Sequence, residues 1–203
     1  MKLYLLFLLM ATTTVLSPGP GVVMTLSNAL RFGLRGTLGG IVGIAAGAML
    51  VAAISATSLG ILLATSALAF TVLKLLGAAY LFYLAIRLWR APPFSFAAQP
   101  THDASLGRCF IEGLSLQLTN PKAIFFFLSV FPQFIDPAQP YPLQFATLVL
   151  TYSTLVVVIH CGYALFARRA KGWLQSERGG RLLGKISAGS FVYFGASLAT
   201  AQR

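Results

Sequence analysis

Acidic, metal-binding and nucleophilic side chains are scarce in this sequence. Its 203 residues include four Asp and Glu, two His and two Cys, and charged residues of both signs make up only 9%. An ordinary soluble domain carries about 25% charged residues, so this chain has too little polar surface to coat a soluble globule. The composition therefore excludes a disordered chain, a coiled coil and almost any water-soluble fold.

The same scarcity argues against enzymatic and nucleotide-driven functions. Cys109 and Cys161 are far apart and lie in or beside apolar runs, so we interpret both as packing residues rather than as a disulfide or metal ligands. The chain contains neither a complete GxxxxGK[ST] phosphate-binding motif nor a GxSxG nucleophile motif. We therefore expect no catalytic residues, no bound metal and no cofactor.

Apolar residues dominate instead. Hydrophobic side chains make up 57% of the chain, and the mean hydropathy is +0.81. A helix needs about 20 apolar residues to cross a bilayer, and the runs lack the alternation of barrel strands. The fold class predicted is all-α: a polytopic membrane protein with six transmembrane helices, at roughly 3–30, 37–63, 67–88, 110–134, 143–166 and 182–199.

The first run has two readings. Lys2 followed by the apolar stretch 3–10 resembles a signal peptide, but no convincing small-x-small cleavage site follows. Because the apolar sequence continues to Leu30, we expect this run to remain as the first membrane helix.

Basic residues are confined mainly to alternate loops. Fifteen Lys and Arg against four acids give a net charge of +11. Eleven of the fifteen lie in three loops, at 31, 35, 87, 90, 108, 168, 169, 171, 178, 181 and 185. The positive-inside rule places these loops in the cytoplasm and both termini outside, as in a multi-pass protein of the inner (cytoplasmic) membrane. Basic residues distributed in this way indicate loop anchors and not a nucleic-acid interface.

A proline-rich linker divides the single transporter domain, residues 1–203, into two halves. The linker at 91–107 contains Pro92, Pro93 and Pro100, and the halves cover 1–90 and 108–203. Three helices is an odd number, so the halves have opposite orientations and predict an inverted repeat. The first helix of each half is interrupted, at the Ser-Pro-Gly-Pro-Gly segment 17–21 and at Asn120-Pro121.

These breaks predict a site inside the membrane. Proline has no N–H group, so the carbonyls of Thr14, Leu16 and Gln117 lose their helical donors. Ser17 and Asn120 are favourable N-cap residues, each followed by a proline at the first position of a half-helix. The free N–H groups of two half-helices favour an anion such as an amino-acid carboxylate. The alternative is a pair of plain proline kinks.

Four motifs are distributed along nearly the whole chain: Ser-Pro-Gly-Pro at 17–20, Leu-Lys-Leu-Leu-Gly-Ala-Ala-Tyr-Leu at 73–81, Thr-Asn-Pro-Lys-Ala at 119–123, and Phe-Pro-Gln-Phe at 131–134. Together they resemble the signature of the LysE/RhtB superfamily of bacterial amino-acid exporters. The resemblance implies a six-helix secondary exporter of amino acids or related zwitterions, coupled to protons or another ion. The chain departs from the family at Gly21, where many relatives have Asn, at Gly47-Ala48 and at Ala85.

The breaks and the charges inside the runs supply the candidate site residues. We expect substrate binding at Ser17, Pro18, Gly19, Pro20, Gly21, Asn120, Pro121 and Lys122. Lys122 either serves this site or snorkels to an interface. Three residues are candidates for ion coupling, each with a structural alternative: Glu112 as a partner of Arg108, His160 as a packed neutral ring, and Lys74 as a snorkelling cation.

Glycines at 39, 43 and 47 form a stripe of small residues at four-residue spacing. Such a stripe allows close helix packing, either against another helix of the chain or against a second protomer of a homodimer. An ion or metal exporter on the same scaffold is an alternative function, although the scarcity of acids, Cys and His argues against transition metals. A membrane-embedded enzyme is the less favoured alternative.

Overall fold

The structure is a computed structural model that describes residues 2–65, 67–94, 105–136 and 138–200. Every regular element within these ranges is helical. The elements are α1 (Lys2–Leu16), α2 (Pro20–Thr65), α3 (Ala67–Arg90), α4 (Leu106–Leu118), α5 (Pro121–Phe125), a π-helical turn η1 (Phe126–Val130), a 3-10 turn η2 (Phe131–Phe134), α6 (Tyr141–Arg169), α7 (Lys171–Leu174) and α8 (Glu177–Thr200). The all-α class predicted from the sequence is confirmed for the described residues.

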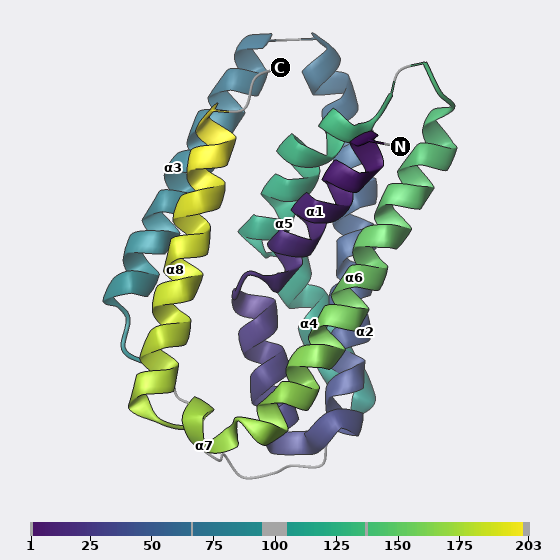
Figure 1. Cartoon of the computed structure of the whole chain (residues 1–203). Helices are drawn as coiled ribbons and strands as arrows, with labels where there is room; N and C mark the ends of the chain where they lie inside the picture. Colours follow the sequence, from purple (N-terminus) through teal and green to yellow (C-terminus); the bar gives the residue numbers. More distant parts are fainter. Residues whose placement is uncertain (1, 66, 95–104, 137, 201–203) are drawn as a thin grey trace.

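Two stretches are long and apolar enough to cross a membrane, judged by length and composition among the described residues. They are Pro20–Ala56 of α2 and Tyr141–Arg169 of α6, and Leu3–Leu16 is a shorter apolar helix. The helix α2 consists of two helical limbs, because Gly33 has a left-handed backbone (φ 68°, ψ −173°). Glycine adopts this conformation without the steric cost that a side chain brings, and the chain changes direction there (Figure 1).

The helices form two groups. The helix α2 packs against α4 and α6, and α1 packs against α6, whereas α3 packs chiefly against α8. Figure 1 shows α3 and α8 running side by side at one edge of the bundle. Aromatic residues of η1 and η2 join α1, α2 and α6 in the largest core, where Phe7 and Phe127 are almost completely buried. A separate small cluster holds α3 to α8, through Leu81 and Phe191 among others.

The glycine stripe packs against α4 of the same chain. A Cβ atom on Gly43 would lie 2.1 Å from the carbonyl oxygen of Phe110, and one on Gly39 would lie 2.3 Å from that of Leu106. Gly113 of α4 makes the reciprocal approach, 2.2 Å from the carbonyl oxygen of Gly40. Of the two predicted partners, the structure shows a helix of the same chain, and at Gly39, Gly43 and Gly113 the neighbouring backbone leaves no room for a Cβ atom.

Both predicted helix interruptions are present. The helix α1 ends at Leu16 and α2 begins at Pro20, while α4 ends at Leu118 and α5 begins at Pro121. Asn120 is the N-cap of α5, and its side chain accepts a hydrogen bond from the backbone N–H of Lys122, as predicted. Pro121 occupies the first helical position.

The prediction that Ser17 caps the second half-helix and Pro18 begins it is wrong. Helical dihedrals are disfavoured for a residue before proline, which is consistent with Gly19 staying outside the helix and α2 starting only at Pro20. Ser17 instead finishes α1. Its backbone N–H donates to the carbonyl of Thr13 (3.0 Å), and its hydroxyl donates to that of Thr14 (3.1 Å).

Candidate functional site

Lys122 connects the two breaks. It lies at the start of α5, and its ammonium group reaches the C-terminal end of α1, where Nζ donates to the carbonyls of Thr14 (2.9 Å) and Ser17 (2.8 Å). Nζ also lies 3.1 Å from the hydroxyl of Ser17. The side chain is buried, and these three contacts match the three N–H donors of an ammonium group. A cation is favoured here because the C-terminal end of a helix carries a partial negative charge.

The loose carbonyls predicted at the first break are bonded by side chains from distant helices. Lys122 bonds the carbonyl of Thr14, and the hydroxyl of Tyr163 on α6 donates to the carbonyl of Leu16 (2.5 Å). At the second break, the carbonyl of Gln117 accepts from the nearby backbone N–H of Asn120 (3.2 Å). Since the carbonyl of Thr14 also accepts from the nearby hydroxyl of Ser17, the first break combines a local bond with tertiary contacts, while the second is satisfied locally.

A small polar cavity lies between the breaks. Its volume of about 20 Å³ is room for roughly one water molecule. Its lining includes both breaks and the middle of α6: Val15, Gly21, Val22, Ile44, Gln117, Asn120, Lys122, Tyr152, Val156 and His160. Three of the residues predicted for substrate binding, Gly21, Asn120 and Lys122, are thus brought together with the coupling candidate His160.

His160 is buried in this cavity and bonded to α2. Its Nδ1 lies 2.6 Å from the hydroxyl of Thr25, a hydrogen bond in which either atom can be the donor. A Cβ atom on Gly21 would lie 3.3 Å from Cε1 of His160. The absence of a side chain at Gly21 therefore leaves room for the imidazole ring of His160.

A larger, mostly apolar cavity lies on another side of the first break. Its volume is about 360 Å³, and it is lined by Gly19, Pro20, Val23, Met24, Leu88, Phe94, Leu116 and Ser187. It brings together α2, α4 and α8 with the end of α3. A Cβ atom on Gly19 would lie 3.2 Å from Nζ of Lys122, so this cavity begins beside the ammonium group.

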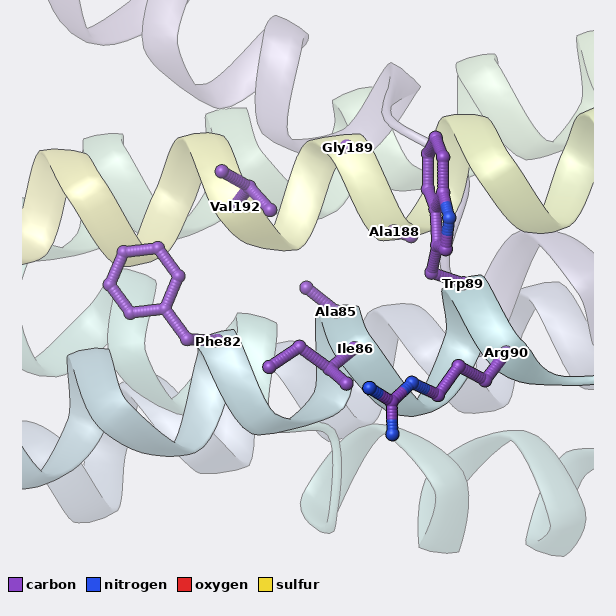
Figure 2. Close-up of a pocket in the computed structure, with 8 residues that line it drawn as sticks. All are labelled: Phe82, Ala85, Ile86, Trp89, Arg90, Ala188, Gly189 and Val192. Atoms are coloured by element: carbon purple, nitrogen blue, oxygen red, sulfur yellow. The ribbon is translucent and has the colours of Figure 1, made fainter.

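A third hollow lies between α3 and α8, away from both breaks. Figure 2 shows its lining of Phe82, Ala85, Ile86, Trp89, Arg90, Ala188, Gly189 and Val192. Its volume is about 320 Å³. Among the described residues, none of those predicted for the site lines it and Arg90 is its only charged side chain, so we do not assign substrate binding to it.

The structure places the other coupling candidates differently. Glu112 forms an ion pair with Arg108 one helical turn away (3.1 Å), and its side chain is 46% exposed. The predicted structural partnership of these two residues is therefore confirmed, and Glu112 does not line the small cavity. The side chain of Lys74 lies outside the part of the chain that the structure describes.

Sequence reasoning missed several residues of this region. Tyr163, Thr25 and Ser187 all contact or line it, yet each looks like an ordinary residue of an apolar helix. Their roles follow only from the packing of distant helices. For Tyr163, the sequence offered one signal: Pro20 leaves the carbonyl of Leu16 in need of another donor. That expectation does not say which residue provides the donor.

The interrupted helices, the buried lysine and the apolar composition are typical of membrane transporters. The chain belongs to the LysE type translocator family, whose model matches residues 12–202. It is 36% identical over 196 residues to the homoserine/homoserine lactone efflux protein of Salmonella typhimurium, covering 97% of this chain and 95% of the relative. It is 30% identical over 209 residues to the leucine efflux protein of Salmonella choleraesuis, covering 98% and 95%. No solved structure matches the chain.

These relationships identify an integral membrane protein of a translocator family and not an enzyme. The recognition of the LysE/RhtB superfamily from the sequence is confirmed. An uncharacterized membrane protein of Vibrio cholerae is also 36% identical, over 199 residues that cover 98% of this chain and 97% of that protein.

Proposed function

We propose that this protein is a secondary-active exporter of amino acids or closely related small zwitterions across the cytoplasmic membrane. The observation that carries the proposal is the buried ammonium group of Lys122. Lys122 follows the second helix break, and its ammonium group is bonded to the carbonyls at the first break. Two cavities lie beside this contact. The names of the relatives, which concern efflux of homoserine, homoserine lactone and leucine, support this substrate class.

The proposed topology has six membrane crossings with both termini outside. The first crossing joins α1 to the first limb of α2, and the fourth joins α4, α5, η1 and η2. The second limb of α2, α3, α6 and α8 supply the others. The halves 1–90 and 108–203, separated by a cytoplasmic linker at 91–107, then form an inverted repeat with one break in each half. The matching positions of the breaks support this arrangement.

In the proposed mechanism, the substrate carboxylate replaces the backbone carbonyls of Thr14 and Ser17 as the hydrogen-bonding partner of the Lys122 ammonium group. The ammonium group is now bonded to these neutral carbonyls at the end of α1. Hydrogen bonds between two ionised groups are shorter and stronger than those to a neutral acceptor, so an entering carboxylate can compete for the same donors. Release of Thr14 and Ser17 would free α1 from α5 and allow the first break to change its shape.

The group formed by α3 and α8 is the proposed moving element. These two helices pack chiefly against each other, and the apolar cavity lies where they meet α2 and α4. The seam between α2 and α4, by contrast, is closed by backbone contacts at glycine. Alternating access would then consist of movement of the α3–α8 pair against the remaining helices around the breaks.

His160 is the proposed proton-coupling residue. Its buried ring lines the same small cavity as Lys122 and is bonded to Thr25. A change in the charge of His160 would therefore act directly on the proposed ion pair between the Lys122 ammonium group and the substrate carboxylate. Glu112, exposed and paired with Arg108, lacks such a position.

Transport by the purified protein in liposomes tests the proposed function. Counterflow of radiolabelled homoserine, leucine, alanine and lysine would be measured with and without an imposed proton gradient. We expect exchange of at least one neutral amino acid and its acceleration by the gradient. Failure to exchange any amino acid in this panel, by protein that remains monodisperse and folded, would refute the assignment.

A further inference from the structure

We infer that the hollow between α3 and α8 binds an anionic phospholipid, with one acyl chain over Ala85, Ala188 and Gly189 and the phosphate group beside Arg90 and Lys185. This inference goes beyond the proposed export function, because it concerns a lipid of the membrane and not a transported molecule. It uses the proposed topology, in which α3 and α8 cross the membrane and their basic ends face the cytoplasmic leaflet.

The hollow has the length and the lining that an acyl chain needs. It follows residues 82–90 of α3, a length of about 12 Å at 1.5 Å per helical residue. Figure 2 shows the ring of Phe82 at one end and that of Trp89 at the other, with the small residues Ala85, Ala188 and Gly189 between them. A Cβ atom on Gly189 would meet no atom of the described residues within 4 Å, so the hollow is open at this point.

Apolar side chains around the hollow are turned to the surroundings of the protein. Ile86, Trp89 and Val192 all line it and are all exposed. An exposed apolar surface with a hollow of about 320 Å³ marks an interaction site. On a pair of helices that cross a membrane, acyl chains are the molecules that such a surface meets.

Trp89 indicates the depth of the hollow in the membrane. Tryptophan is enriched where the membrane meets water, because its ring is apolar and its N–H group is polar. Trp89 lies in the last turn of α3, so the hollow starts at the level of the lipid headgroups and continues past Ala85 toward Phe82, into the apolar interior. A phospholipid has its polar and apolar parts in the same order.

Basic side chains gather at the Trp89 end. Nζ of Lys185 lies 5.3 Å from the centre of the Trp89 ring, and Arg90 lines the hollow itself. The end of α3 and the start of α8 carry five exposed basic residues: Arg87, Arg90, Arg178, Arg181 and Lys185. Arg181 is paired with Glu177. The other four form no ion pair within the part of the chain that the structure describes, and a phosphate group would provide an anionic partner.

The same charges disfavour a second copy of this chain as the occupant. Most homodimers have a two-fold axis, so each copy presents the same surface to the other. Two copies joined at this hollow would hold the basic ends of both α3–α8 pairs at one depth, and like charges across an interface are unfavourable. An anionic phospholipid has the complementary charge, and basic pockets between membrane helices on the cytoplasmic side are typical sites for anionic headgroups.

Quenching of Trp89 fluorescence by brominated lipids tests the inference, because bromine quenches tryptophan only at short range. The chain contains two Trp residues, and Trp173→Phe leaves Trp89 as the only one. This protein is placed in phosphatidylcholine vesicles with increasing fractions of brominated phosphatidylglycerol or of brominated phosphatidylcholine with the same acyl chains. We expect the anionic lipid to bind about fivefold or more tightly, since each basic residue near the membrane surface contributes roughly this factor.

Gly189→Leu, in the Trp173→Phe background, tests the place of the acyl chain. The added side chain fills the hollow, so Trp89 quenching by brominated phosphatidylglycerol should fall to the level for phosphatidylcholine. Gly162→Leu on α6 is the matched control, because a Cβ there also meets no atom of the described residues within 4 Å, and Gly162 does not line the hollow. It should leave the preference unchanged.

A pair of double variants tests the place of the phosphate group. Arg90→Gln with Lys185→Gln should reduce the preference for the anionic lipid to about twofold or less. Arg168→Gln with Arg169→Gln removes the same charge from the end of α6, away from the hollow, and should retain the preference. These variants leave the packed residues unchanged, so they decide the question even where Gly189→Leu does not fold.

The outcomes that would overturn the inference are distinct. Equal quenching by the two lipids, no quenching by either, or a preference retained by Gly189→Leu or by the variant without Arg90 and Lys185 would each show that it is wrong. If Gly189→Leu instead turns a dimer into a monomer, measured by light scattering, and leaves the quenching unchanged, the hollow is an interface between copies. None of these measurements involves transport, so the exporter assignment stands or falls separately.

Discussion

Nζ of Lys122 lies 2.8 Å from the carbonyl oxygen of Ser17. The side chain of a residue at the second helix break thus caps the C-terminal end of α1 at the first break. This contact joins α1 to α5, elements that lie in different halves of the chain. It gives Lys122 a place inside the bundle that snorkelling to an interface does not provide. Whether the same ammonium group also holds a substrate is the first prediction to test.

Lys122→Met removes the charge and keeps much of the apolar stem. We expect it to weaken binding of carboxylate substrates by about 10- to 100-fold, the range for a hydrogen bond to a charged group, and to weaken binding of an amidated analogue much less. Isothermal titration with purified protein measures both. Lys171→Met, at an exposed position on α7, is the control. Equal losses for the acid and the amide would indicate a role in folding or gating instead.

Replacement of both Pro18 and Pro20 by Ala should impair transport without unfolding the protein. Each proline inside a helical segment opposes helix formation by about 3 kcal/mol, so the variant can extend α1 into α2. The carbonyls of Thr14 and Leu16 would then bond backbone N–H groups and leave Lys122 and Tyr163. Initial transport rates and the midpoint of thermal unfolding are the measurements. Wild-type transport by a normally expressed variant would mean that the break has only a structural role.

Pro142→Ala serves as a control for that experiment. Pro142 lies in the first turn of α6, where a proline is tolerated because the N–H groups of that turn have no partner within the helix. Its replacement should leave both transport and stability close to the wild-type values.

Gly43→Ala should destabilise the protein, whereas Gly162→Ala should not. A Cβ on Gly43 would meet the carbonyl oxygen of Phe110 at 2.1 Å, and forcing extra volume into a packed interface costs about 1–3 kcal/mol. No atom of the part of the chain that the structure describes lies within 4 Å of a Cβ on Gly162. This second change should be neutral or gain up to about 1 kcal/mol of helix propensity. Unfolding in detergent by heat compares the two, and equal midpoints would contradict the tight seam.

His160→Gln and Glu112→Gln should separate the coupling candidates. Glutamine keeps a hydrogen-bonding group near Thr25 but cannot carry the proton of an imidazole. We expect His160→Gln to retain substrate exchange and to lose its acceleration by a proton gradient. Glu112→Gln should keep that acceleration, because it removes only an exposed ion pair with Arg108. The reverse result would assign coupling to Glu112.

Local chemistry made the helix breaks and the glycine seam predictable. Proline removes a backbone donor wherever it stands, and glycines four residues apart share one face of a helix, so both features follow from short stretches of sequence. The same reasoning identified Asn120 as a cap. It misplaced the start of α2, because prolines at 18 and 20 are both candidates for the first helical position and the second one disfavours helical dihedrals at Gly19.

The partners across the bundle could not be predicted in this way. The contacts of Lys122 with Thr14 and of Tyr163 with Leu16 depend on how complete helices pack, and the sequence offers many polar residues that could meet a free carbonyl. Ser187 is a stronger example, because one serine among several on α8 lines the larger cavity without bonding the backbone.

The first break is completed by residues that are synthesised much later. Lys122 follows Thr14 by 108 positions, and Tyr163 follows Leu16 by 147. While the ribosome is still making the first half, the carbonyl of Thr14 can accept from the hydroxyl of Ser17, whereas that of Leu16 still lacks Tyr163. An unbonded carbonyl in hydrocarbon is costly. In the proposed topology, the first crossing would therefore enter the membrane with an unbonded carbonyl at Leu16 that water or the insertion machinery must cover until α6 is made.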